Sequence, residues 1–151
     1  MKFFIQRVNH ANVSIESAII GQIQKGFLIF IGVCDSDDEA IADKMIKKTA
    51  ALRIMADHAG KTNLSIQDVG GQILAVSQFT LYADCKKGNR PSFFKSGSPE
   101  HANALYEYII KEFREQYGFT VATGEFGADM KVTLENDGPF SVMLDSDELF
   151  S

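Results

Sequence analysis

The chain has 151 residues, a common length for one domain, of which 45% are hydrophobic and 23% charged. This composition excludes a disordered, collagen-like or coiled-coil protein. The net charge of −5 argues against indiscriminate binding to nucleic acid, which needs a basic surface, and no DNA partner is expected. The longest apolar run, Phe27 to Val33, is far shorter than the about 20 residues of a membrane span, so no membrane partner is expected either.

The N-terminus and the cysteines predict a cytoplasmic protein. Gln6 and Arg7 interrupt the first apolar residues, which excludes a signal-peptide core. Cys34 and Cys85 lie far apart and form no C-x-x-C pair, so the sequence indicates neither a zinc site nor a disulfide framework. We find no repeat or linker, and therefore predict a single domain over residues 1–151 without a metal.

The first third of the chain predicts strands. Apolar and polar residues alternate in residues 3–8 and 13–15, and another apolar segment follows at 19–23. The run 27–33 is apolar on both faces, which is typical of a central, buried strand.

A helical pattern follows, from about Asp37 to about Leu52. Ser36 and Glu39 have the spacing of a capping box, in which each side chain binds the backbone N–H of the other residue. The inward positions then recur at helical spacing: Ile41, Met45, Thr49 and Leu52. The acidic residues 35–39 are therefore interpreted as a helix start, where the dipole favours negative charge, and not as a metal site.

The second half predicts more strands around one further helix. A short strand is expected at 53–56 and a long one at 72–82, which is rich in β-branched and aromatic residues. Ser98 and Pro99 suit the cap and first turn of a helix that ends at Gly118. Strands follow at 119–123, 130–135 and 140–144. The predicted fold class is α+β, a mainly antiparallel, curved or barrel-like sheet with two helices against it.

The usual catalytic signatures are absent from the sequence. It contains no glycine-rich phosphate loop, no H-E-x-x-H and no G-x-S-x-G. His10, His58 and His101 lie in unrelated segments, and each is interpreted as a surface or cap residue. No cofactor is predicted.

Two short segments stand out. Residues 77–82, S-Q-F-T-L-Y, place two hydroxyls and an amide in an apolar run, which on its own fits the solvent face of a strand. Residues 136–139, N-D-G-P, on their own predict a turn. Together and in this order, the two segments resemble the paired signature of the D-aminoacyl-tRNA deacylases. The similarity extends over essentially the whole chain, through 6–8, 70–71, 87–93 and 124–130.

The resemblance implies an activity and an assembly. Members of the family hydrolyse the ester that joins a D-amino acid to the 3′ end of tRNA, and they also remove glycine mischarged on tRNA. They are homodimers with two sites at the subunit interface, so the expected partners are aminoacyl-tRNA and a second copy of the chain.

The same resemblance implies the site residues. The catalytic segment maps to Ser77, Gln78, Phe79 and Thr80. Substrate binding maps to Met130 and to the pair Gly138–Pro139. In the family the bond of this pair is cis, and the pair enters the partner subunit's pocket, where its carbonyls reject L side chains.

Physical chemistry makes this site plausible without a catalytic triad. An aminoacyl ester is already activated, so an enzyme needs only to position the carbonyl against hydrogen-bond donors and place a water molecule. The adenosine 2′-OH beside the ester offers a route for the proton. We rank Thr80 as a nucleophile below water, because no base adjoins it in sequence. Three basic residues after the catalytic segment are predicted to bind tRNA phosphates: Lys86, Lys87 and Arg90.

The sequence departs from the family after the Gly-Pro pair. Phe140 and Ser141 stand where members often carry Val and Thr, so the packing behind the pair differs. Two alternatives stay open. One is a related deacylase with a trans Gly-Pro bond and relaxed chirality, and the other is a non-catalytic RNA-binding dimer of the same fold.

Overall fold

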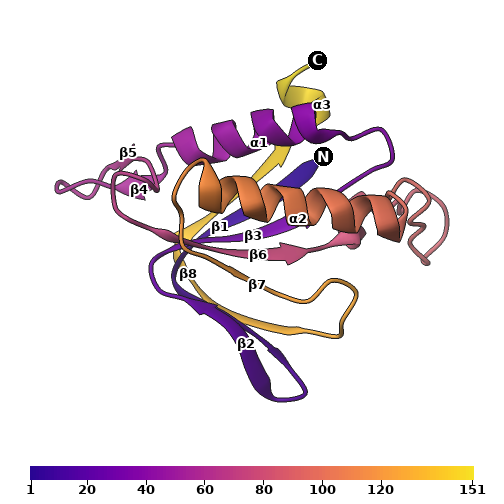
Figure 1. Ribbon diagram of the computed structural model, residues 1–151, viewed down its shortest axis with the longest axis horizontal. Coiled ribbons are helices and arrows are strands. Elements are labelled where there is room, and N and C mark those ends of the chain that lie inside the picture. The colour runs from indigo at the N-terminus through magenta and orange to yellow at the C-terminus, as the bar shows by residue number, and fades with distance from the viewer.

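The computed structural model describes residues 1–151 and contains eight strands, three α-helices and one 3-10 helix, η1. In chain order the elements are β1 (Lys2–Ile15), β2 (Ala18–Ile23), β3 (Gly26–Gly32), α1 (Glu39–Ala51), β4 (Met55–Ala56), β5 (Thr62–Leu64), β6 (Gln72–Ser77), η1 (Phe79–Tyr82), α2 (Pro99–Glu115), β7 (Val121–Thr123), β8 (Lys131–Asp145) and α3 (Ser146–Leu149). Helices α1 and α2 cover one face of the sheet side by side (Figure 1). No helix is long and apolar enough to cross a membrane.

The main sheet is mixed: three of its five strand pairings are antiparallel, and the prediction of a mainly antiparallel sheet did not include the two parallel ones. Its strand order is β2-β1-β3-β6-β7, with β8 paired to β1. Strand β1 is antiparallel to its three partners, whereas β3–β6 and β6–β7 are parallel. Parallel neighbours need a long crossover connection, and α1 and α2 supply the two crossovers. The predicted alternation of strands and helices already indicated such crossovers, and therefore parallel neighbours.

The sheet curls toward closure, as the barrel-like prediction required. A Cβ added to Gly21 of β2 would lie 2.7 Å from the carbonyl oxygen of Thr123 in β7, so the two ends of the sheet meet closely there. Seven buried residues fill the inside of the curl: Val8, Ala11, Val13, Ile23, Leu28, Leu74 and Val76. The larger core lies between the sheet and the helices.

Strand β3 is the central, buried strand that its sequence predicted. Phe27, Ile29 and Ile31 belong to the core under the helices, while Leu28 belongs to the core inside the curl. Burial on both faces explains the continuous apolar run.

The start of α1 differs from the predicted capping box. Asp38, not Ser36, is the N-cap, and its carboxylate accepts a hydrogen bond from Ile41 N at 2.8 Å. Asp37 is buried and pairs with the Met1 ammonium group at 2.7 Å, an ion pair that also ties the N-terminus to the start of α1. In α2 the predicted cap is confirmed, since Ser98 accepts from His101 N and Pro99 begins the helix.

Two predicted elements of the second half are corrected. The long strand ends at Ser77: its pairing with β3 ends in the bond from Gln78 N to Ile31 O at 2.8 Å, and the chain then turns into η1. The two predicted strands 130–135 and 140–144 form one strand, β8, since both halves pair with β1. A third helix, α3, was not predicted, and its four residues are too few to show a period.

Candidate active site

A cleft of about 540 Å³ opens where β3 and β6 end. The two strands are parallel, so their carboxyl ends meet at one edge of the sheet, a place where α/β proteins commonly bind ligands. The cleft is lined by 16 residues from four segments: Ile31 with Val33, Val76–Phe79, Ser96–Gly97 with Pro99 and Ala102, and Phe126–Met130 with Val132.

Three of the four predicted catalytic residues line this cleft: Ser77, Gln78 and Phe79. Thr80 lies just beyond it, exposed, with its hydroxyl hydrogen-bonded to the Gln78 side-chain amide. Ser96 Oγ donates to the carbonyl oxygen of Phe79 at 3.1 Å, which fixes η1 against the loop that leads to α2. The first N–H groups of a helix have no partner within it, and Phe79, the first residue of η1, lines the cleft.

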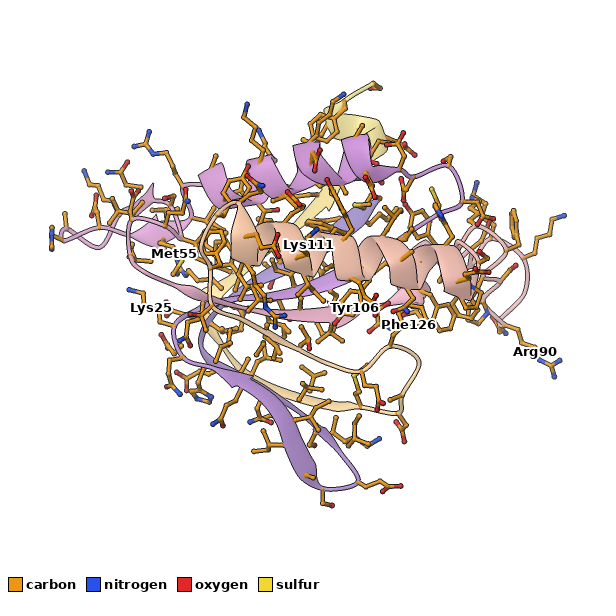
Figure 2. The ribbon with its side chains drawn as sticks, viewed as in Figure 1. Lys25, Met55, Arg90, Tyr106, Lys111 and Phe126 are labelled. Carbon is orange, nitrogen blue, oxygen red and sulfur yellow. The ribbon has the colours of Figure 1, made fainter.

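Met130 also lines the cleft, as predicted. Its sulfur packs against Gly124, where an added Cβ would lie only 2.5 Å from the Met130 Sδ atom. Any side chain at 124 would displace Met130, so glycine there sets the position of the cleft wall. Phe126, on the same segment, lies beside Tyr106 of α2 with ring centroids 6.3 Å apart (Figure 2).

The chemistry available in the cleft comes from hydroxyls, one amide and the backbone. Asp129 is its one ionisable lining residue, and its exposed carboxylate pairs with Lys131 Nζ at 2.9 Å. No hydrogen bond joins Thr80 to a carboxylate or an imidazole, and no group of three acidic, His or Cys side chains converges anywhere as a metal site would require. The site therefore offers no strong side-chain base.

Two buried tyrosines support the cleft from behind. Tyr106 Oη donates to the carbonyl oxygen of Ala75 in β6 at 2.7 Å, and burial raises the pKa of this tyrosine to about 12. Burial also raises the pKa of Tyr82 far above its ordinary value, with Asp37 adding to the effect, and its hydroxyl has no hydrogen-bond partner. Both side chains are neutral at physiological pH and serve as structure.

Gly138 and Pro139 do not line this cleft within one protomer. They lie exposed in a bulge of β8, where the four residues 137–140 stand opposite the single residue Arg7 of β1, and their peptide bond is cis. The Asn136 side chain closes the bulge, since its Oδ1 accepts from Phe140 N at 2.7 Å and its Nδ2 donates to Phe140 O at 3.1 Å.

Arg7 holds the other side of the bulge. Its Nε donates to the carbonyl oxygen of Asp137 at 3.1 Å, and its Nη1 to the carbonyl oxygen of Ile54 at 2.8 Å. In the sequence, Arg7 stood out only as part of a family segment. The available signal was a charged residue between Ile5 and Val8, inside an apolar strand.

The predicted basic residues lie on the exposed loop between η1 and α2. Backbone hydrogen bonds between Asp84 and Ser92, of 2.7 and 2.9 Å, close this loop at its base. No ion pair involves Lys86, Lys87 or Arg90, and Arg90 points away from the body of the protein (Figure 2). The loop returns to the cleft at Ser96 and Gly97, while Lys86 and Lys87 line a separate hollow on its outer part.

The structure thus brings together Ser77–Thr80 and Met130, and leaves Gly138–Pro139 on a separate surface. Residues that sequence reasoning did not single out also line the cleft: Ser96, Gly97, Pro99 and Phe126. They come from the loop, from the start of α2 and from the segment after β7, whose approach to β6 depends on the tertiary fold.

Comparison with known proteins agrees with this geometry. The family model for D-Tyr-tRNA(Tyr) deacylase matches residues 4–145. A protein of Thermosipho melanesiensis named D-aminoacyl-tRNA deacylase is 52% identical over 99% of this chain and 100% of its own. Proteins of the same name from Lactobacillus delbrueckii subsp. bulgaricus, 56% identical over 96% of this chain and 99% of its own, and from Clostridioides difficile, 47% identical over 99% and 100%, are also similar.

Two solved structures share the fold. One, titled "c-Myc DNA Unwinding Element Binding Protein", has a TM-score of 0.91 and 34% identity over 96% of this chain and 98% of its own. The other, titled as a probable eukaryotic D-amino acid tRNA deacylase, has a TM-score of 0.82 and 16% identity over 95% and 97%. Given a family match over nearly its whole length and relatives about half identical to it, the chain belongs to the D-Tyr-tRNA(Tyr) deacylase family, a family of enzymes.

Proposed function

We propose that this protein hydrolyses the ester of D-aminoacyl-tRNA and of glycyl-tRNA in the cytoplasm, releasing the amino acid and free tRNA, and leaves L-aminoacyl esters intact. One observation carries the proposal. The cleft at the ends of β3 and β6 is lined by Ser77, Gln78 and Phe79, and its one carboxylate, Asp129, is exposed and paired with Lys131, which suits a substrate that is already activated.

The chemistry needs positioning more than a strong nucleophile. The free N–H groups at the start of η1, near Phe79, are the donors that would hold the developing oxyanion on the ester carbonyl. A water molecule attacks the carbonyl carbon, the bond to the ribose 3′ oxygen breaks, and the neighbouring 2′-OH relays the proton to that oxygen. Thr80 assists by holding the Gln78 side chain in place, since the Thr80 hydroxyl accepts a hydrogen bond from the Gln78 side-chain amide.

The chirality filter rests on the pair Gly138–Pro139 and a second copy of the chain. The pair is exposed in one protomer and does not line its own cleft, yet its bulge is held by Arg7 and Asn136, which supports a role at a surface that another protomer covers. In a homodimer, the pair would enter the partner's cleft. Backbone carbonyls there would block an L side chain, admit a D side chain that points away, and have nothing to block in glycine.

Assaying three substrates separates this proposal from its alternatives. D-tyrosyl-, L-tyrosyl- and glycyl-tRNA are incubated with the protein, and release of the amino acid is compared with spontaneous hydrolysis. Cleavage of the D and glycyl substrates alone is the expected result. Cleavage of the L substrate would indicate a deacylase with relaxed chirality. If the protein binds tRNA but cleaves none of the three substrates, it is a non-catalytic RNA-binding protein.

A further inference from the structure

The loop between η1 and α2 carries two adjacent phenylalanines that point to different places. Phe93 packs edge-on against Phe79 of the cleft, with ring centroids 5.0 Å apart. Phe94 is 74% exposed, the highest value for any large apolar side chain in the protein. Phe79, Phe93 and Phe94 therefore follow one another from the cleft to the outer surface of the loop.

Beside Phe94 lies a separate hollow of about 310 Å³, lined by Asp84, Lys86, Lys87, Ser92 and Phe94. Its one carboxylate is already engaged, because Asp84 Oδ1 accepts from Lys86 N at 3.0 Å and Oδ2 pairs with Lys95 Nζ at 3.3 Å. The side-chain ammonium groups of Lys86 and Lys87 have no acidic partner. The hollow thus presents two cations without an acidic partner next to an exposed aromatic ring, and Lys95 Nζ lies 5.7 Å from the centroid of that ring.

We infer that this hollow binds a nucleotide of the single-stranded 3′ end of tRNA, immediately before the terminal aminoacyl-adenosine. Single-stranded RNA is typically held by stacking its bases on aromatic side chains and by placing its phosphates on lysine or arginine. Here Phe94 takes the base, and Lys86 and Lys87 take the phosphate. The inference rests on the proposed function, which places the terminal adenosine in the cleft beyond Phe93 and Phe79.

A fluorescence experiment tests binding without relying on catalysis. The protein contains no Trp, so Phe94→Trp introduces a single reporter. Its emission is followed during titration with uncharged tRNA and with the same tRNA shortened at its 3′ end to the double-stranded stem. The matched control is Phe150→Trp, since Phe150 is also exposed and has Lys44 Nζ 5.5 Å from its ring centroid, but lies at the end of the C-terminal helix α3.

Saturable quenching of the Phe94→Trp protein by intact tRNA, with little change for the shortened tRNA and for the Phe150→Trp protein, is the expected result. Equal responses to both tRNAs would overturn the inference. So would an absence of any response from the Phe94→Trp protein while filter binding shows the tRNA bound.

Kinetics separate this inference from the proposed function. Phe94→Ser is expected to lower kcat/KM for D-tyrosyl-tRNA by roughly tenfold, the usual effect of losing one stacked base. It should leave hydrolysis of D-tyrosyl-adenosine unchanged, because that substrate lacks the preceding nucleotide, and Phe94→Tyr should retain full activity. Reduced rates on both substrates, unchanged rates on both, or a shift in oligomeric state would contradict the inference. A wild-type protein inactive on both substrates would instead refute the proposed function, and the fluorescence titration would still decide this inference.

Discussion

The guanidinium carbon of Arg7 lies 4.8 Å from the centre of the Phe140 ring, so a cation of β1 stacks on the aromatic residue that follows Gly138–Pro139. The same guanidinium hydrogen-bonds the carbonyl oxygens of Asp137 and Ile54. Space there is limited, since a Cβ on Gly138 would lie 3.0 Å from Arg7 Nη2. Phe140 therefore packs under Arg7 at the edge of the bulge.

Arg7→Lys should loosen the Gly138–Pro139 bulge while keeping the charge. A lysine has no planar fork, so it cannot hold two carbonyls and stack on Phe140 at once. We expect the ratio of D-tyrosyl- to L-tyrosyl-tRNA hydrolysis to fall, by a factor of about ten if roughly 1.4 kcal/mol of positioning is lost. The control is Lys2→Ala, a change on the same strand away from the bulge. An unchanged D/L ratio would count against a role for this bulge in chirality.

Thr80→Ala should lower kcat without abolishing it. The Thr80 hydroxyl is hydrogen-bonded only to the Gln78 side-chain amide, which is not a base, so we propose that water and not Thr80 is the attacking nucleophile. We expect a loss of no more than about tenfold, the value of one hydrogen bond to a positioned group. Single-turnover hydrolysis of D-tyrosyl-tRNA measures the effect. A complete loss of turnover, with unchanged thermal unfolding and tRNA binding, would favour Thr80 as the nucleophile.

Replacing Lys86, Lys87 and Arg90 together by Ala should weaken tRNA binding and flatten its salt dependence. Removing a cation that binds one phosphate is expected to reduce the slope of log K against log salt by about one unit. The matched control replaces three exposed lysines of α1, Lys44, Lys47 and Lys48, which lie away from the cleft. Filter binding at several salt concentrations gives the slopes. Equal slopes for the two triple variants would show that the loop has no special part in binding.

Tyr106→Phe should destabilise the protein at neutral pH by about 1 kcal/mol, because it removes a buried hydrogen bond to Ala75. Tyr82→Phe is the matched comparison and should be neutral or stabilising, since the Tyr82 hydroxyl has no partner. Urea unfolding at pH 7 distinguishes the two. A cost for Tyr82→Phe equal to that for Tyr106→Phe would contradict this account.

The raised pKa of Tyr106 predicts how the free energy of unfolding changes with pH. Burial raises the pKa of Tyr106 from 10.0 to about 12, so the folded state holds this proton more tightly than the unfolded chain. The resulting stabilisation is complete below pH 10 and is lost as the pH rises from about 10 through 12. Urea midpoints measured across that window should fall less steeply for Tyr106→Phe than for the wild type.

The sequence alone determined the features that depend on local pattern. The cap of α2 at Ser98, the buried run of β3 and the inward face of α2 follow from hydrogen bonding and periodicity within a few residues. The family motifs likewise lie on short segments, and they singled out Ser77–Phe79 and Met130, which the fold brings to one cleft.

The tertiary structure decided what depends on distant partners. Strand β6 ends at Ser77 where its pairing with β3 ends, at the bond from Gln78 N to Ile31 O, and no local signal marks that point. Asp38 rather than Ser36 caps α1, while the neighbouring Asp37 binds the Met1 ammonium across 36 positions of sequence. The segment 136–139 leads into the bulge at 137–140 and does not form a hairpin turn, because both halves of β8 pair with β1. The strand pairings join residues that are far apart in the sequence. They form only when packing brings the two segments together, so no segment predicts them by itself.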